Sequence, residues 1–210
     1  HDLDEGAPVT GGVRPPIIGI VGGIGSGKSA VSKLLADAGC LVSDADALAN
    51  RSLDEPEVRD VLVSWWGDSL LDDDGHVRRS VIADRVFSDP EQLRRLEQLI
   101  HPRVDAMRRA AFDSAPETVP ALVIDAPLLL EAGLASECDC IVFVDAPLDV
   151  RLERVADSRG WDAAELTRRE DRQLPLDEKR SMAHHVVLNH RRLEDLREQV
   201  DSLLEALGRL

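Results

Sequence analysis

The sequence predicts an α/β protein built on a parallel β-sheet with helices on both faces. Apolar runs of strand length recur along the chain, and segments with the helical period of about 3.6 residues separate most of them. The first apolar run ends in the glycine-rich segment GGIGSGKS at residues 22–29. Because alternating strands and helices favour a sheet covered on both sides, we expect a three-layer α/β/α core with five parallel strands.

Each expected strand is a short apolar run. Residues 17–21 (IIGIV) form a continuous, mostly β-branched run, which is typical of a parallel strand buried on both faces. Helical patterns are expected after the first strand and after the last one, over residues 31–38 and 193–207. The remaining strands are expected at residues 40–46, 121–127, 138–147 and 185–189.

Residues 46–119 contain no convincing strand and show helical periodicity instead, at positions 58–65 and 93–100. His101-Pro102 predicts a break in this helical segment, because a residue before proline avoids the α conformation. We therefore expect a helical lobe at about residues 53–118, inserted into a core of residues 17–52 and 119–210 within one domain. The Gly- and Pro-rich residues 1–16 are expected to form a flexible tail.

Composition and charge exclude several classes of function. The chain has 25 Lys and Arg residues against 40 Asp and Glu residues, a net charge of −15, so we expect no nucleic-acid partner. No apolar run is long enough to span a membrane, and the start does not resemble a secretory signal, which predicts a cytoplasmic protein without a membrane partner. Three cysteines without zinc-like spacing are expected to be small buried residues, and we expect a monomer or a weak homo-oligomer.

The segment from Gly22 to Ser29 fits the phosphate-loop pattern G-x-x-x-x-G-K-[ST] between a strand and a helix. Glycines in this pattern let backbone N–H groups surround the phosphates, and Lys28 is expected to reach the β- and γ-phosphates. The Ser29 hydroxyl is expected to bind Mg²⁺. The sequence therefore predicts nucleotide binding, with contacts from Gly23, Ile24, Gly25, Ser26, Gly27, Lys28, Ser29 and Ala30.

The loop alone does not separate a GTPase, an ATP-driven motor and a small-molecule kinase. The guanine-reading motif N-K-x-D is absent, which argues against a GTPase. The segment DDDG at residues 72–75 is also no calcium loop, since Leu70 and Val81 would occupy its first and last ligand positions. We interpret it as a solvated turn.

The second expected strand ends in two aspartates, Asp44 and Asp46, which lie on the same side of an extended segment. This carboxyl edge of the sheet also carries the phosphate loop. A carboxylate there can accept a proton from a hydroxyl group and orient that hydroxyl toward the γ-phosphate. Alternatively, one or both residues cap a helix that starts near Ala47, a reading that suits Asp44 better than Asp46.

Several segments together resemble the dephospho-coenzyme A kinase family. They are GGIGSGKS, DAD (44–46), LEQLIHP (96–102), PLLLE (127–131) and the late pattern RQ, K and AHHVVLN (172–189). The resemblance runs from Ile17 to about Leu207. It implies a P-loop kinase fold with a helical substrate lobe and a lid at about residues 154–172. It also implies ATP-dependent phosphorylation of the ribose 3′-hydroxyl of dephospho-coenzyme A, the last step of coenzyme A synthesis, with Mg²⁺ and ATP as co-substrate.

The resemblance also implies roles for particular residues. Asp46 would be the catalytic base, Lys28 would act on the phosphates, and Arg154 and Arg159 would be catalytic cations of the lid. Asn189 would lie near the adenine of ATP. The acceptor would be bound by Asp46, Arg79, His101, Pro102, Pro127, Leu128 and Glu131.

Two positions depart from the family pattern. The family often has Ala-Asp before the last strand, where this chain has Ala183-His184, and a basic residue four positions after the second Asp, where it has Asn50. Two other functions stay open: a related kinase that acts on a nucleotide or another small alcohol, and a nucleotide-dependent switch protein. Hydrolysis without an acceptor, together with capture of a partner protein, would favour the switch.

Overall fold

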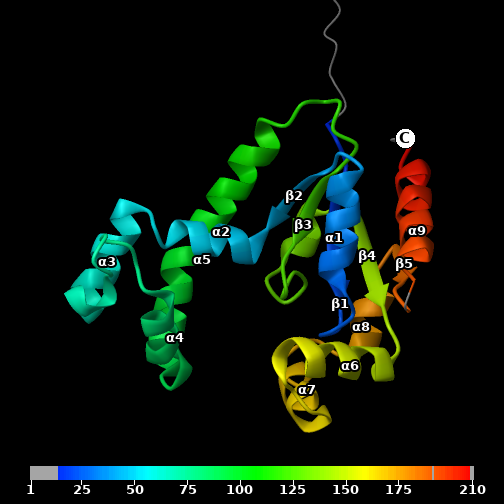
Figure 1. Cartoon of the computed structure of the whole chain (residues 1–210). Coiled ribbons are helices and arrows are strands. Elements are labelled where there is room, and N and C mark those ends of the chain that lie inside the picture. The colour runs from blue at the N-terminus through cyan, green and yellow to red at the C-terminus, as the bar shows by residue number, and fades with distance from the viewer. Residues whose placement is uncertain (1–13, 191, 209–210) are drawn as a thin grey trace, which may run out of the picture.

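The computed structural model describes residues 14–190 and 192–208. Five strands form a parallel sheet in the order β2-β3-β1-β4-β5, which confirms the predicted sheet (Figure 1). The strand β1, which leads into the phosphate loop, lies at the centre. The strands are β1 (Ile17–Gly22), β2 (Leu41–Asp44), β3 (Leu122–Asp125), β4 (Cys140–Asp145) and β5 (His185–Leu188).

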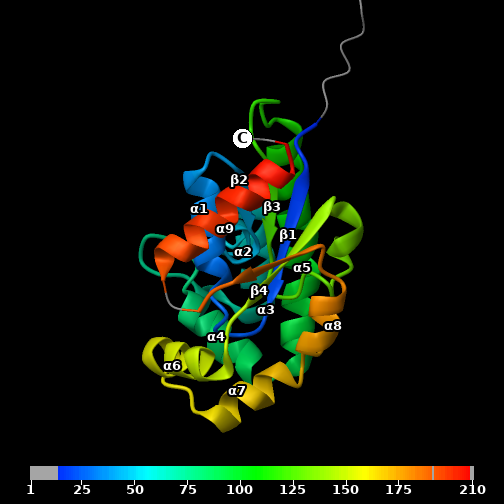
Figure 2. The ribbon, with the colours of Figure 1, turned by 90° about the vertical axis from the view of Figure 1, so that its right-hand side faces the viewer.

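Helices cover both faces of the sheet, as the alternating pattern predicts. The first and last helices, α1 and α9, pack side by side on one face (Figure 2). The other face is covered by the segment after β3 and by parts of α5 and α8. The helices are α1 (Lys28–Asp37), α2 (Ala45–Ser52), α3 (Pro56–Trp66), α4 (Arg79–Phe87), α5 (Pro90–Asp113), α6 (Leu148–Arg159), α7 (Ala163–Glu170), α8 (Leu176–Ser181) and α9 (Leu193–Ala206).

The central strands are buried on both faces, which explains why their sequences are apolar without alternation. Ile18 and Ile20 of β1 point into the cluster formed with α1 and α9, whereas Val21 points into the cluster on the opposite face. Cys40 and Cys140 are buried and Cys138 is half-buried, so the cysteines behave as the small core residues that we expected. None of the helices in the described ranges combines the length and apolarity needed to cross a membrane.

The helices α2 to α5 extend to one side of the sheet and share a separate hydrophobic cluster (Figure 1). Val58 and Leu62 of α3 are fully buried in this cluster, together with Ile82 of α4 and Ile100 of α5. Leu93, which the periodicity assigned to the same face as Ile100, is 40% exposed. The helix α2 packs on α5 and contributes to the cluster, so this group of helices begins at Ala45, before the expected boundary near residue 53.

The predicted break at His101-Pro102 is wrong. Helix α5 continues through Pro102 to Asp113, and its start is capped by the Asp89 side chain, which accepts from the backbone N–H groups of Glu91 and Gln92. A proline inside a helix costs about 3 kcal/mol, because it lacks one N–H donor and its ring crowds the preceding turn. Burial of Ile100 and Val104 on either side of Pro102 offsets this cost.

Two further expectations concern the ends and turns of the chain. Most of the expected tail, residues 1–13, lies outside the described residues. The residues that follow contact the sheet: Arg14 pairs with Asp139 at 3.1 Å, and the carbonyl of Pro16 accepts from the N–H of Leu122 at 2.9 Å. The DDDG segment is the exposed turn that we expected, closed by the Asp72 carboxylate on the N–H groups of Asp74 and His76.

Candidate active site

The phosphate loop joins β1 to α1 at the carboxyl edge of the sheet. Its glycines are required by the backbone, because Gly25 and Gly27 have φ angles of 77° and 86°, in the left-handed region. A side chain on Gly27 would also collide with the Asn189 amide. The backbone therefore has the strand, tight turn and helix that the sequence pattern predicts.

Two side chains from later in the sequence hold this loop from outside. The Asn189 amide is buried, and its Nδ2 donates to the carbonyl of Ser26 at 2.9 Å. The Arg154 guanidinium donates to the carbonyls of Gly25 and Ser26 at 3.2 and 3.1 Å, and to Asn189 Oδ1 at 3.2 Å. The expected roles of Asn189 near the adenine and of Arg154 in the lid stay predictions, since these contacts are to the loop backbone and between the two side chains.

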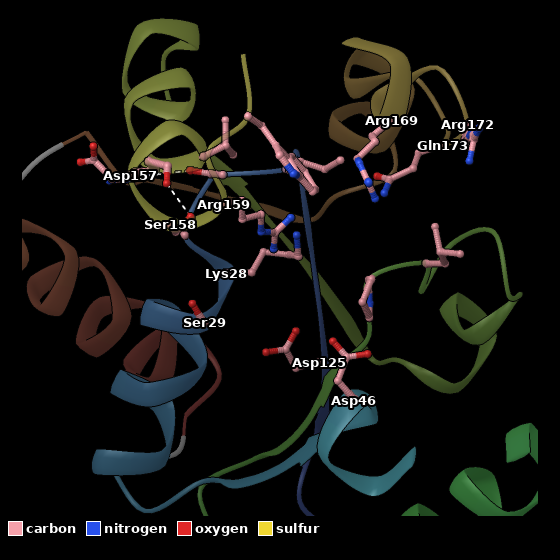
Figure 3. Close-up of a pocket in the computed structure, with 18 of the residues that line it drawn as sticks. Lys28, Ser29, Asp46, Asp125, Asp157, Ser158, Arg159, Arg169, Arg172 and Gln173 are labelled. Carbon is pink, nitrogen blue, oxygen red and sulfur yellow. Dashed lines mark hydrogen bonds between the residues drawn. The ribbon is translucent and has the colours of Figure 1, made fainter. Parts of the chain in front are cut away.

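A pocket of about 820 Å³ opens between the loop, the ends of β2 and β3, and the helices α6 and α7 (Figure 3). Its walls combine cationic and anionic side chains with apolar ones. The lining residues include Ile24, Gly25, Gly27, Lys28, Ser29, Asp44, Asp46, Asp125, Pro127, Leu128, Arg154, Arg159, Trp161, Arg169, Arg172 and Gln173.

Cations and carboxylates face each other in this pocket. Lys28 and Arg159 lie opposite Asp46 and Asp125 (Figure 3). Burial lowers the pKa of Lys28 from its ordinary value of 10.5, while the negative charge of Asp125 acts in the opposite direction. Lys28 Nζ also donates to the carbonyl of Gly22 at 3.4 Å. This arrangement places a buried positive charge where the phosphates of a nucleotide would enter.

The expectation that Asp44 and Asp46 share one side of an extended segment is wrong. Strand β2 ends at Asp44, whose Oδ1 accepts from the N–H of Ala47 at 3.0 Å and so caps α2. Asp46 lies in the first turn of α2 and faces the pocket (Figure 3). Burial raises the pKa of Asp46 above its ordinary value of 3.8, and the nearby charges of Asp44 and Asp125 add to the rise.

Comparison with known proteins decides the family. A family model described as dephospho-CoA kinase matches residues 16–195. The chain belongs to the dephospho-CoA kinase family. The dephospho-CoA kinase of Deinococcus radiodurans is 40% identical over 195 residues, which cover 92% of this chain and 93% of the relative. That of Thermobifida fusca is 36% identical over 194 residues, 91% of this chain and 96% of the relative.

Solved structures share the fold of this chain. A crystal structure of a protein from Thermus thermophilus matches with a TM-score of 0.76 at 36% identity, over 93% of this chain and 99% of the other. The dephospho-CoA kinase from Campylobacter jejuni shares the fold, with a TM-score of 0.67 at 20% identity, over 91% of this chain and 97% of the other. The predicted resemblance, the α/β P-loop kinase fold and the class of enzyme are therefore confirmed.

The sequence analysis did not predict several residues that line the pocket of this dephospho-CoA kinase family member. Asp125 ends β3, and its Oδ2 accepts from the Ser32 hydroxyl at 2.5 Å. Its position after an apolar run at the carboxyl edge was a usable signal, the same one that singled out Asp46. Arg169 and Arg159 stack on the Trp161 ring, with guanidinium carbons 4.1 and 4.6 Å from the ring centroid. No local pattern marks these contacts, because they join residues from two helices and the turn between them.

The residues expected on the acceptor side of the kinase are not all brought together. Pro127 and Leu128 line the pocket, but Arg79, His101 and Pro102 lie outside its walls, on the helices of the α2 to α5 group. Arg79 donates to the carbonyl of Asn50 and pairs with Asp54, at 3.2 and 3.1 Å. The acceptor roles of these residues stay predictions.

Glu131, the last of the expected acceptor residues, contacts the segment between α7 and α8. Its Oε1 accepts from the N–H of Leu174 at 2.9 Å and lies 3.2 Å from Nζ of the fully buried Lys179. Burial by itself would raise the pKa of Glu131, but the hydrogen bonds from Leu174 and Lys179 outweigh it and lower the pKa. In this arrangement Glu131 neutralises a buried lysine and does not line the pocket.

The oxygen atoms at the pocket floor fit a magnesium ion. Ser29 and Asp125 present a hydroxyl and a carboxylate to the same space (Figure 3). Hard oxygen donors of this kind, completed by phosphate oxygens and water, are the ligands that Mg²⁺ prefers in kinase sites. The chemistry of the donor set is therefore that of a magnesium–nucleotide site.

Proposed function

We propose that this enzyme transfers the γ-phosphate of ATP to the ribose 3′-hydroxyl of dephospho-coenzyme A, giving coenzyme A and ADP. The observation that carries the proposal is a carboxylate, Asp46, facing the phosphate-loop lysine, Lys28, across one pocket. This geometry suits an alcohol as the acceptor. A hydroxyl between the two groups can lose its proton to Asp46 and attack a γ-phosphate that is held by Lys28.

In the proposed reaction, Asp46 accepts the proton of the 3′-hydroxyl as the oxygen attacks the γ-phosphorus. A new oxygen–phosphorus bond forms, and the bond between the γ-phosphorus and the bridging oxygen of ADP breaks. Lys28 and the phosphate-loop N–H groups hold the charge on the phosphate oxygens. Magnesium, when bound with ATP, neutralises phosphate charge, and the Ser29 hydroxyl with Asp125 would hold it.

The helices α6 and α7 would act as a lid in this reaction. They bring Arg159 and Arg169 to the pocket from the side opposite α2 (Figure 3), and Arg154 of α6 also lines it. A guanidinium group is always charged and can bind two phosphate oxygens, so it suits the stabilisation of a transferred phosphate. Closure over both substrates would exclude water and limit futile hydrolysis of ATP. The helices α2 to α5, which carry Arg79, His101 and Pro102, would bind the acceptor.

The proposed partners, location and assembly of the enzyme are argued from its charge and its pocket. The net charge of −15 supports a protein without a nucleic-acid partner, and a cytoplasmic kinase would have ATP at hand. The reaction as proposed needs no group from a second copy, and a monomer or a weak homo-oligomer remains our proposal for the assembly.

The test is ADP release with Mg²⁺ and ATP, with and without dephospho-coenzyme A, followed by mass spectrometry of the product. Release that depends on the acceptor, and a product heavier by one phosphate, would support the proposal. ATP binding without this product would point to a kinase for a nucleotide or another small alcohol. Hydrolysis without any acceptor would favour the switch protein.

The raised pKa of Asp46 predicts the pH dependence of transfer. Only the deprotonated carboxylate can accept the hydroxyl proton, so activity is lost as the pH falls through this pKa. We expect the acid limb of kcat/KM to lie above the range of an ordinary aspartate, because that pKa is raised above 3.8. Asp44→Asn keeps an oxygen that can cap α2 but removes one of the charges that raise the pKa, so the limb should move to lower pH. Identical pH profiles of kcat/KM for the two proteins would contradict this assignment.

A further inference from the structure

A buried ion pair outside the predicted site joins the two lid helices. Nη1 of Arg151 on α6 lies 2.6 Å from Oε1 of Glu170, the last residue of α7. The two side chains are only 8% and 22% exposed. Neither residue takes part in the reaction as described above, so the pair needs a separate explanation.

Both members of the pair also bind the same residue of the phosphate loop. The backbone N–H of Ile24 donates to Glu170 Oε1 at 3.2 Å, and Arg151 Nη1 donates to the carbonyl of Ile24 at 3.3 Å. The pair packs against the neighbouring Gly23 so closely that an added Cβ would lie 2.9 Å from Arg151 Nη1 and 3.0 Å from Glu170 Oε1. The backbone of Ile24 is therefore held through both its donor and its acceptor.

This contact fixes the position of α7 relative to the loop. Arg169, which lines the pocket and stacks on Trp161, directly precedes Glu170 in the chain. Arg172 and Gln173, which follow α7, line the same pocket (Figure 3). Because Glu170 joins α7 to Ile24, the distance from these groups to the phosphate loop depends on the pair.

Stability alone is a weak reason for such a pair. Buried ion pairs contribute little net stability, because the desolvation of both charges offsets their attraction, and apolar residues of similar size often replace them without loss. An ion pair of comparable burial, Arg108 with Glu137 at 2.9 Å, lies away from the pocket walls and joins α5 to the segment before β4. Arg108 also pairs with Asp105 at 2.8 Å, so this group of charges provides a comparison of similar burial for a purely structural role.

We propose that Arg151 and Glu170 are positioning residues that hold Ile24 of the phosphate loop and set the distance of Arg169 from the transferred phosphate. This proposal rests on the proposed function only where it assumes dephospho-coenzyme A as the acceptor. Binding of ATP tests it without the acceptor, so a wild-type enzyme that binds ATP but does not phosphorylate dephospho-coenzyme A would refute that function and leave this proposal standing.

The first experiment compares two conservative variants by calorimetry with Mg²⁺ and ATP. Glu170→Gln keeps an oxygen for the N–H of Ile24 but loses the charge toward Arg151, and we expect ATP affinity to fall roughly tenfold. Glu137→Gln removes the same charge from the comparison pair, and its ATP affinity should stay within about twofold of wild type. Equal affinities for Glu170→Gln and wild type would overturn the proposal.

The double variant Arg151→Met with Glu170→Met separates positioning from folding. It leaves no unpaired buried charge, so its Tm should lie close to that of wild type. ATP affinity should nevertheless stay reduced, and acceptor-independent hydrolysis should rise relative to transfer, because Ile24 and α7 are no longer joined. Recovery of both Tm and ATP affinity in the double variant would mean that the pair serves folding alone.

Discussion

Replacing Asp46 by asparagine should lower the rate of phosphate transfer by about 10²- to 10⁴-fold, the usual contribution of a general base. The variant keeps the size and polarity of the side chain, but it removes the negative charge and with it the ability to accept a proton. Asp46 faces the pocket from the first turn of α2, and its raised pKa makes the carboxylate a stronger proton acceptor than an ordinary aspartate. ATP affinity should change only a few-fold, so the loss should appear in kcat.

The control for this variant is Asp44→Asn, two residues earlier. Asp44 caps α2, and asparagine caps a helix about as well as aspartate, so both the fold and the rate at pH 7 should be retained. Rapid-quench or coupled assays under saturating ATP would separate kcat from binding. A rate for Asp46→Asn within tenfold of wild type would exclude it as the base and direct attention to Asp125, the other carboxylate facing Lys28.

Replacing Lys28 by methionine should lower kcat/KM by about 10²- to 10³-fold, as expected for loss of one preorganised charge on the transferred group. The same change should leave Tm unchanged or raise it. The physical reason is that burial lowers the pKa of Lys28, which means that the folded protein holds this charge at a cost in stability. Methionine has nearly the same length and carries no charge that must be desolvated.

Lys33→Met on the same helix is the matched control. Lys33 is 75% exposed and pairs with Asp37, one helical turn away, at 3.3 Å. Exposed pairs of this kind contribute little, so both activity and Tm should stay close to wild type. Thermal unfolding measured beside steady-state kinetics checks both parts of the prediction. A clear loss of Tm in Lys28→Met would show that the lysine supports the fold as well as the reaction.

Local patterns were sufficient for the phosphate loop and for the sheet. The loop depends on glycines that tolerate positive φ, at Gly25 and Gly27, and on a fixed spacing to Lys28 and Ser29. The apolar runs identified all five strands, most clearly the central ones, because burial on both faces leaves a composition that is visible without alternation. Such features are encoded within ten residues or fewer, so no knowledge of distant contacts was needed.

Two of the local rules failed, for different reasons. The rule for the residue before proline predicted a break at His101, but burial of Ile100 and Val104 keeps α5 continuous. The alternation rule for strands put Asp44 and Asp46 on one side, but the chain turns into α2 directly after Asp44. For α5 the local preference amounts to about 3 kcal/mol, which tertiary packing can exceed. For Asp44 the cause is local, because its side chain accepts from the N–H of Ala47 and starts α2.

For this protein, the sequence alone determined the fold class and the phosphate loop, because each depends on residue types at short and fixed spacing. The resemblance to the family proposed Asp46 as the base. Only the tertiary structure decided that Asp125 and Arg169 line the same pocket as Lys28, and that Arg151 and Glu170 hold Ile24 from positions far along the chain. These contacts arise when the parallel strands align their carboxyl ends and the lid helices pack beside the loop. Such neighbours are set by folding, and no spacing in the chain encodes them.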